Sequence, residues 1–294
     1  MIELRQVTKE YGQVTILKNI TLCVDEPGIY CLLGRNGAGK TTLLKSIAGY
    51  QNITNGTIKV NGKTITTSTL DTGVSYIENF AKHFNLPVRK LLRIASEVNP
   101  NYDYDFASEM MERFELDGKK KFNQLSLGMK TMVSTIVCLA SNKSVVLLDE
   151  PVLGFDALMR VEFYDMLTES FKKHPRIIIV STHIIEEIVK TIQKLIIIDK
   201  GNVRFFDTLQ AVETKAFRIS GLQKDVEDAT QNLHVIGQDM VGGLVTRYIF
   251  DNPPEQTASL EIQPLSLQDF FIQWLDIKEV QQDDRYFFDC KTLD

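Results

Sequence analysis

The sequence predicts an α/β fold built around a parallel β-sheet. Three continuous apolar runs are each followed by a turn: residues 29–33, 145–148 and 177–181. Strands that are buried on both faces of a parallel sheet have this pattern. Helical patterns begin at Lys40, at about Leu158 and at Ile184, after these runs. Because strands alternate with helices, we expect an α/β core.

Shorter strand-like runs accompany this core: Ile2–Val7, Ile20–Val24, Thr57–Val60 and Leu195–Asp199. The alternation stops between residues 80 and 122, where Phe84–Glu97 and Asp105–Phe114 have helical patterns and little strand signal. We therefore expect an inserted helical subdomain at about residues 80–140.

The character of the chain changes near residue 211, beyond the turn signal at Gly201 and Asn202. The tail has short strands, one helical stretch and a last helix that opens with a serine at the N-cap position. These elements are Ala216–Ile219, Val226–Leu233, Leu244–Phe250, Ser259–Ile262 and Ser266–Leu275. The sequence thus predicts two domains, at 1–210 and 211–294, the second a small α+β domain.

Composition narrows the classes of function. The 294 residues carry a formal charge of −5, with −8 in residues 211–294 and +3 in the first 210. No basic patch of the kind that binds nucleic acid stands out, so nucleic acid is not an expected partner. The N-terminus lacks the design of a signal peptide, and the apolar runs are far shorter than the ~20 residues of a membrane helix. We expect a soluble protein that serves a membrane, if at all, through another protein. The four cysteines have no CxxC spacing, which predicts buried, reduced thiols; they are Cys23, Cys31, Cys138 and Cys290.

A glycine-rich motif follows the first buried run directly. Residues 34–41 read GRNGAGKT and fit the P-loop pattern GxxxxGK[ST], whose glycines let backbone N–H groups surround phosphates at a helix N-terminus. Lys40 is expected to reach the β- and γ-phosphates of ATP, and the Thr41 hydroxyl to ligate Mg²⁺. The strand before the motif and the helix after it argue against a chance glycine-rich turn. The expected nucleotide-binding residues are Gly34, Asn36, Gly37, Ala38, Gly39, Lys40, Thr41 and Thr42.

Two carboxylates, Asp149 and Glu150, follow the second buried run. Ligands in open α/β sheets lie at the carboxyl ends of strands. Asp149 is therefore placed to hold Mg²⁺, directly or through water, and Glu150 to polarise the attacking water as general base. Adjacent acids after a strand are also compatible with plain solvation, but their pairing with the glycine-rich motif favours the catalytic interpretation.

Residues 125–130, which read LSLGMK, lie between these two motifs. With two substitutions this segment resembles the LSGGQ signature of ABC ATPases, and the motif order over 1–210 resembles that of an ABC nucleotide-binding domain. The resemblance implies a P-loop NTPase fold of ABC type, with an antiparallel β subdomain and a helical insertion. It also implies a head-to-tail pair of copies around two ATP, in which Ser126 and Gly128 contact the γ-phosphate bound to the opposite copy.

The resemblance assigns roles to three further residues. His183 matches the switch histidine that bonds the γ-phosphate, Asp156 the D-loop residue that communicates across the dimer, and Tyr11 the aromatic that stacks on adenine. Lys40, Glu150 and His183 are then the catalytic residues, and we expect ATPase activity. The other histidines are expected to be structural or solvated; these are His83, His174 and His234.

The sequence departs from the family pattern at two places. ABC domains place a Gln that contacts Mg²⁺ before the helical subdomain, but residues 74–79 contain none. Asn79 is the best match for a metal contact there, with Glu78 as the alternative. In the signature, Leu127 replaces a glycine and Met129 the usual Gln.

The layout and the tail segment 263–272, which reads QPLSLQDFFI, resemble the ATPases of bacterial exporters that have separate membrane subunits. This resemblance implies three features: a transmembrane permease partner, a peripheral location on the cytoplasmic face of the membrane, and export of drugs or of amphipathic peptides such as phenol-soluble modulins or bacteriocins. A soluble, non-transport ABC ATPase of translation or DNA repair is the alternative. A P-loop kinase or GTPase is a more remote one, because it would not need the LSLGMK segment or His183.

Overall fold

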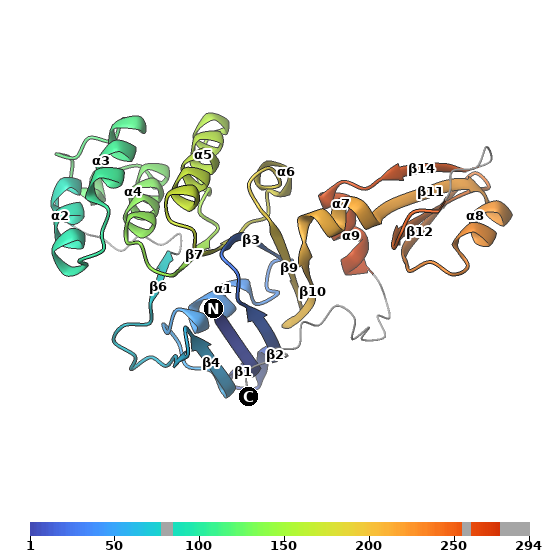
Figure 1. Cartoon of the computed structure of the whole chain (residues 1–294), viewed down its shortest axis with the longest axis horizontal. Helices are drawn as coiled ribbons and strands as arrows, with labels where there is room; N and C mark the ends of the chain where they lie inside the picture. Colours follow the sequence, from blue (N-terminus) through green and yellow to red (C-terminus); the bar gives the residue numbers. More distant parts are fainter. Residues whose placement is uncertain (78–84, 255–259, 277–294) are drawn as a thin grey trace. The chain divides into compact units, whose positions relative to one another are not determined.

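The computed structural model describes residues 1–77, 85–254 and 260–276. This part of the chain falls into two compact units. The first contains Met1–Ile192 and Ile196–Phe205, and the second contains Gln193–Leu195 and the residues from Phe206 onward. Figure 1 shows the course of the chain from the N-terminus in blue to the later elements in orange and red.

The central sheet has six strands. In spatial order they are β10 (Asn202–Thr208), β9 (Lys194–Asp199), β3 (Gly28–Leu33), β8 (Ile177–Ser181), β7 (Val145–Asp149) and β6 (Val74–Ile77). The neighbours β3 and β8, β8 and β7, and β7 and β6 are parallel. Every residue of β3, β7 and β8 is buried, which is why these strands appear in the sequence as uninterrupted apolar runs. The predicted parallel core is confirmed.

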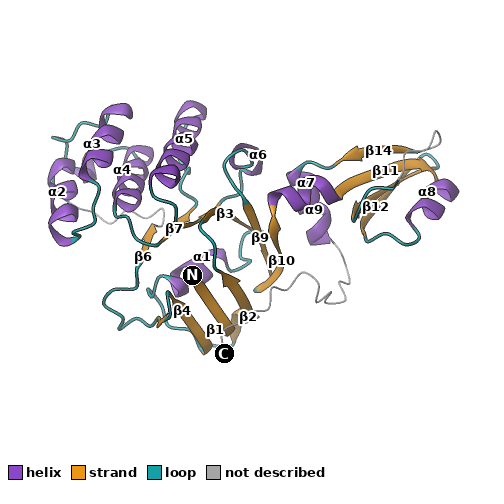
Figure 2. Ribbon diagram, viewed as in Figure 1, coloured by secondary structure: helices purple, strands orange, loops and turns teal. Residues whose placement is uncertain are grey.

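A second, antiparallel sheet completes the lower part of this unit in Figure 2. Its order is β2 (Val14–Val24), β1 (Ile2–Tyr11), β4 (Asn55–Val60) and β5 (Lys63–Thr64). Helix α1 (Lys40–Ile47) contacts β2 and β4 on one side and β6 and β7 on the other, so it fills the space between the two sheets. The antiparallel subdomain that the family resemblance implies is therefore present.

The insertion between β6 and β7 is helical, as predicted. It contains α2 (Val88–Val98), α3 (Tyr104–Arg113), a 3₁₀ turn at Phe122–Gln124 and α4 (Leu127–Ala140), and Figure 2 shows these helices grouped together. Helix α2 begins after Pro87, whose ψ of 140° is not helical, and the proline also disfavours a helical conformation at Leu86 before it. Helix α3 begins after Asp103, whose side chain accepts a hydrogen bond from the N–H of Phe106 at 2.9 Å.

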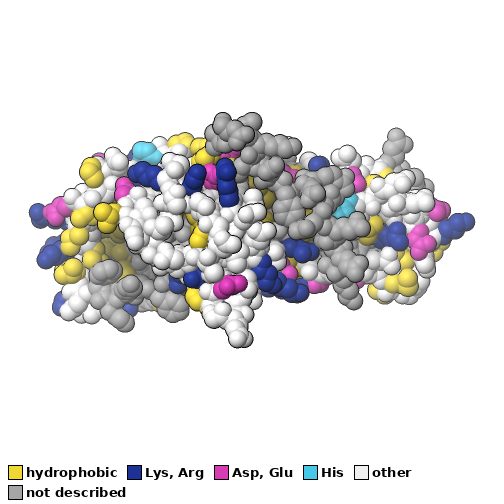
Figure 3. Space-filling model, turned by 90° about the horizontal axis from the view of Figure 1, so that it is seen from below, with side chains coloured by type: hydrophobic (Ala, Val, Ile, Leu, Met, Phe, Trp, Pro, Cys, Tyr) yellow, Lys and Arg dark blue, Asp and Glu magenta, His cyan; other side chains and the backbone are white. Residues whose placement is uncertain are grey.

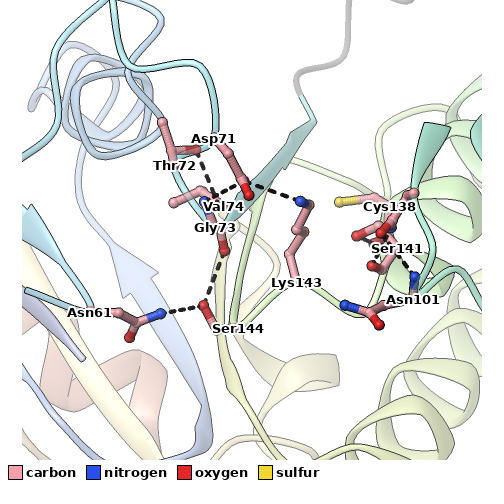
Figure 4. Close-up of polar contacts among 11 residues, drawn as sticks. Asn61, Asp71, Thr72, Gly73, Val74, Asn101, Cys138, Ser141, Lys143 and Ser144 are labelled. Carbon is pink, nitrogen blue, oxygen red and sulfur yellow. Dashed lines mark hydrogen bonds and ion pairs between the residues drawn. The ribbon is translucent and has the colours of Figure 1, made fainter. Parts of the chain in front are cut away.

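Polar side chains join the antiparallel sheet to the edge of the central sheet (Figure 4). Asn61, in the turn between β4 and β5, donates from Nδ2 to the Ser144 hydroxyl at 2.6 Å, and that hydroxyl donates to the Gly73 carbonyl at 3.1 Å. Nearby, Lys143 and Asp71 form an ion pair at 3.2 Å. The N–H of Gly73, followed by Lys143, lowers the pKa of Asp71 from its ordinary value. The turns before β6 and β7 are thus fixed to each other.

Two helices follow β7 and β8 in the first unit. Helix α5 (Ala157–Lys173) agrees with the predicted helix near Leu158. The helix expected from Ile184 is a single turn, α6 (Ile185–Ile188). Among the described residues, none of the helices combines the length and the apolar character that crossing a membrane requires.

The second unit is α+β. Its sheet has the order β12 (Val235–Val241), β13 (Leu244–Phe250), β11 (Ala216–Leu222) and β14 (Glu261–Pro264), with all neighbours antiparallel. Its helices are α7 (Leu209–Lys215), α8 (Gln223–Thr230) and α9 (Leu267–Asp276). Ile219, Val226 and Ile249 lie in its apolar core. The sequence patterns did not predict β12 or α7.

Candidate active site

The loop between β3 and α1 wraps the end of a lysine side chain. Lys40 is 8% exposed, and its Nζ donates to the carbonyl oxygen of Gly34 at 2.7 Å and to that of Arg35 at 3.4 Å. Both acceptors are neutral, so neither cancels the positive charge. Gly39 caps α1 with φ of 108°, a conformation that favours glycine. A cation at the N-terminus of an eight-residue helix is suited to an anionic ligand such as a phosphate.

The other loop residues differ in exposure. Asn36, Gly37 and Thr41 are exposed, Gly34, Ala38 and Gly39 are buried, and Thr42 is half-buried. The carbonyl oxygen of Thr42 accepts a hydrogen bond from Nε2 of Gln51 at 2.7 Å. The exposed Thr41 hydroxyl is therefore accessible to a ligand, whereas the buried residues form the frame of the loop.

Asp149 and Glu150 lie at the carboxyl end of β7. Asp149 is 6% exposed and accepts a hydrogen bond from the Ser181 hydroxyl at 2.6 Å. The N–H of Glu150 donates to the carbonyl oxygen of Ser181 at 3.1 Å and to its hydroxyl at 3.0 Å. Glu150 has φ of 49°, in the left-handed region that a glutamate rarely adopts. Ser181, which the sequence patterns did not single out, thus fixes the backbone that bears both carboxylates.

His183 and Glu150 are brought into direct contact. Nδ1 of His183 lies 2.7 Å from Oε2 of Glu150, and the two side chains are 58% and 24% exposed. Since β3, β8 and β7 are parallel neighbours, Lys40, His183 and Glu150 all follow the carboxyl ends of adjacent strands. The arrangement places a cation, a carboxylate and an imidazole at one edge of the sheet.

The donor set at this edge suits Mg²⁺. Among the described residues no group of three or more His, Cys, Asp or Glu side chains is arranged around a metal position. Mg²⁺ at phosphate sites needs only one or two protein oxygens, because substrate phosphates and water supply the rest. The Thr41 hydroxyl and the Asp149 carboxylate are oxygen donors of this kind. The third predicted ligand, Asn79, and its alternative Glu78 lie outside the described residues.

The signature segment packs against the segment that follows Glu150. Ser126 caps α4 and accepts a hydrogen bond from the N–H of Met129 at 3.2 Å. A Cβ atom on Gly128 would lie 2.9 Å from the carbonyl oxygen of Gly154, so only glycine fits this approach. Asp156 caps α5 and accepts from the N–H of Met159 at 2.9 Å. The predicted signature and D-loop residues therefore form one group around Gly128 and Gly154.

Tyr11 is at the end of β1. Its ring is 51% exposed, its hydroxyl donates to Oε1 of Gln51 at 2.5 Å, and Nζ of Lys9 lies 4.7 Å from its ring centroid. Gln51 also bonds the Thr42 carbonyl oxygen, so it links Tyr11 to α1. Sequence patterns missed Gln51, since its role depends on a contact between segments 40 residues apart.

Two of the four cysteines, Cys31 and Cys138, lie in the core of the first unit. Cys31 is fully buried on β3, and burial, followed by the negative charge of Glu150, raises the pKa of its thiol. Burial raises the pKa of Cys138 to about 12. Both thiols are buried, as predicted.

Known proteins are similar to this chain in sequence. Residues 17–153 match the protein-family model described as ABC transporter. The chain is 27% identical over 268 residues to the ABC transporter ATP-binding protein YtrB of Bacillus subtilis (strain 168), a match that covers 90% of this chain and 92% of YtrB. It is 29% identical over 208 residues to the bacitracin transport ATP-binding protein BcrA of Enterococcus faecalis, covering 69% of this chain and 68% of BcrA.

A solved structure has a similar fold. The dimeric structure of MJ0796, a bacterial ABC transporter cassette, matches with a TM-score of 0.63 at 23% identity, over 71% of this chain and 99% of that chain. Residues 17–153 thus match the ABC transporter family model, the relatives are ATP-binding proteins of transporters, and the chain has the fold of an ABC transporter cassette.

Proposed function

We propose that the chain is the motor subunit of a membrane exporter and that it hydrolyses ATP at the edge formed by β3, β8 and β7. The observation that supports this most directly is the contact between Glu150 and His183 at 2.7 Å, beside a loop that holds the Lys40 ammonium. In this proposal the P-loop residues 34–42 bind the phosphates of ATP and Tyr11 stacks on its adenine.

The proposed chemistry assigns one role to each polar group. Glu150 accepts a proton from the attacking water, and His183 hydrogen-bonds the γ-phosphate and so responds to its presence. Thr41 and Asp149 would hold Mg²⁺, which neutralises phosphate charge when bound. Lys40 adds a fixed positive charge within the loop, where charge that develops on the phosphates is stabilised without reorganisation.

We infer that two copies act together. Ser126 and Gly128 begin a 14-residue helix, and Asp156 begins a 17-residue helix, so each lies at the positive end of a helix dipole. We propose that Ser126 and Gly128 contact the γ-phosphate bound to the second copy and that Asp156 lies near the dimer axis. The dimeric cassette MJ0796, whose fold is similar, supports this arrangement.

We propose that the helical insertion docks on a transmembrane permease subunit. Helices α2 and α3 lie at the left end of the structure in Figure 1. At the left end of Figure 3, hydrophobic side chains lie at the surface among lysines and arginines. The exposed large apolar side chains of these helices are Ile94, Val98 and Tyr104. Residues 1–210 would then form the motor on the cytoplasmic face of the membrane, and residues 211–294 an accessory domain.

The cargo that we propose is a drug or an amphipathic peptide that moves outward. The resemblance of the tail segment 263–272 to exporter ATPases supports this direction, and the relative BcrA is a bacitracin transport protein. No residue of this chain selects the cargo in the proposal, because the membrane subunit forms the translocation path.

Two experiments test this function. Lys40→Ala should abolish ATP binding, measured by titration with a fluorescent ATP analogue, whereas Lys45→Ala on the same helix should not. For transport, the chain is co-expressed with a candidate permease and inside-out vesicles are prepared. ATP-driven accumulation of an amphipathic peptide in these vesicles, lost with Lys40→Ala, supports export; retention of ATPase activity with no co-purifying membrane subunit favours a soluble ATPase.

A further inference from the structure

An ion pair ties the segment that bears His183 to the helix that follows Glu150. Arg160, in the first turn of α5, donates from Nε to both carboxylate oxygens of Glu187 on α6, at 2.9 and 2.8 Å. Its Nη1 also donates to the carbonyl oxygen of Phe155 at 3.0 Å. The Arg160 and Glu187 side chains are 24% and 31% exposed, so the pair is partly shielded from water.

These contacts connect the two chain segments that bear the proposed catalytic pair at a second point. From Glu150 the chain runs through Phe155 into α5 and reaches Arg160. From His183 it runs into α6 and reaches Glu187. Since Glu150 and His183 lie 2.7 Å apart, the two segments are joined at both ends.

Apolar packing and polar contacts together fix the segment after His183. Helix α6 has four residues, and a helix this short is not stable without tertiary contacts. Its buried residues Ile185 and Ile188 anchor one face, while His183 itself is 58% exposed. The charged hydrogen bond from Nε of Arg160, which both carboxylate oxygens of Glu187 share, therefore supplies a directional restraint that apolar packing does not.

We propose that Arg160 and Glu187 are positioning residues for ATP hydrolysis. They fix the position of the His183 segment relative to Glu150. The hydrogen bond from Arg160 to the carbonyl oxygen of Phe155 couples this position to the turn between β7 and α5. The inference rests on the proposed roles of Glu150 and His183. Through this pair, a displacement of the D-loop around Asp156, for example by a second copy, would move the imidazole of His183.

The same helix offers a matched control. Arg113 on α3 and Glu169 on α5 form an ion pair at 2.9 Å, with side chains that are 31% and 50% exposed. This pair also joins an arginine to a carboxylate through α5, but it connects α5 to the helical insertion instead of to α6. Loss of either pair should affect folding stability to a similar extent, because both are partly exposed.

The test compares ATP turnover and thermal unfolding of the full chain carrying Arg160→Gln, Glu187→Gln, both changes, Arg160→Lys or Arg113→Gln. Displacement of the His183 imidazole should weaken its contacts in the transition state more than it weakens the binding of ATP in the ground state. We expect each single change of the Arg160 pair to lower kcat by roughly 10- to 100-fold, with KM for ATP within about twofold. The double variant should fall no further, Arg160→Lys should recover part of kcat, and Arg113→Gln should stay within about twofold of the unchanged chain.

Opposite results overturn the inference. A folded Arg160→Gln variant with unchanged kcat, or one that only unfolds at lower temperature, leaves the pair a purely structural role. If Arg160→Gln does not fold, the nearly isosteric Glu187→Gln gives the same comparison. The unchanged chain and Glu150→Gln are run alongside. If Glu150→Gln abolishes turnover while the Arg160 and Glu187 variants keep it, only the positioning role fails; if Glu150→Gln has no effect, the proposed function fails first.

Discussion

Nδ1 of His183 lies 2.7 Å from Oε2 of Glu150, and this contact joins the chain segments that leave β8 and β7. The two strands are parallel neighbours in which Asp149 pairs with Ser181. The register of the sheet therefore brings the imidazole and the carboxylate together, and the hydrogen bond fixes their relative orientation. The proposed hydrolysis depends on this arrangement and on the loop that holds Lys40.

Replacing His183 should impair hydrolysis more than binding. His183→Ala removes the partner of Glu150 and the proposed bond to the γ-phosphate, so we expect kcat to fall about 100-fold, within the range for one acid–base or polar group. The dissociation constant for ATP should change by less than about threefold, measured by titration. His174→Ala, a 45% exposed histidine near Asp103, serves as the control. Equal losses in both variants would refute a specific role for His183.

Replacing Tyr11 should weaken ATP binding with little effect on kcat. Stacking of a base on an aromatic ring contributes roughly 1–3 kcal/mol, so Tyr11→Ala should raise KM for ATP about tenfold or more. Tyr11→Phe keeps the ring and loses only the hydrogen bond to Gln51, so its effect should be much smaller. Similar KM values for Tyr11→Ala and the unchanged chain would remove Tyr11 from the adenine site.

Adding a methyl group to Gly128 should destabilise the fold. Its Cβ would lie 2.9 Å from the Gly154 carbonyl oxygen, which is closer than real Cβ contacts and requires backbone movement. Gly118→Ala is the matched control, because its nearest contact would be 3.4 Å, to Cβ of Arg89. We expect Gly128→Ala to be about 1–3 kcal/mol less stable than Gly118→Ala in denaturant unfolding. Equal stabilities would show that the signature and D-loop segments are not closely packed.

Stability should fall in acid partly through Asp103. Burial raises the pKa of this carboxyl, but the ion pair with Lys173 and the N–H of Phe106 more than offset it, so the pKa is lower than the ordinary 3.8. A group whose pKa is depressed by folding contributes its full stability above its unfolded pKa and loses it as pH falls through the folded value. In unfolding measurements below about pH 4, Lys173→Gln should flatten this loss and Lys172→Gln should not. The same pH dependence in both variants would contradict the assignment.

The sequence alone predicts the central sheet well because of how its strands are buried. Strands β3, β7 and β8 are covered on both faces, which leaves uninterrupted apolar runs in the sequence. The same reasoning misses β12, where Gly237, Gln238 and Asp239 are not buried and no periodic apolar pattern remains. The helix predicted to begin at Ile184 forms only one turn, α6, because the apolar residues of this segment pack without forming more.

The residues of the candidate site likewise fall into those that the sequence predicts and those that it does not. Lys40, Asp149 and Glu150 could be predicted because each follows a buried run within a short motif. Gln51 and the pair of Arg160 and Glu187 could not, because their contacts join segments whose proximity depends on strand order and helix packing. No local pattern in the sequence encodes these pairings.

The central claim is that Glu150 activates water for ATP hydrolysis in a dimer, and Glu150→Gln tests it most directly. The change removes the base but keeps nearly the same shape, so ATP should still bind. We expect turnover to fall about 100- to 10,000-fold, and size-exclusion chromatography with ATP and Mg²⁺ should show a stable dimer, since bound ATP is no longer consumed. Glu186→Gln, an exposed acid on α6, should leave both properties unchanged. Unchanged turnover in Glu150→Gln, together with a monomer in the presence of ATP, would contradict the account.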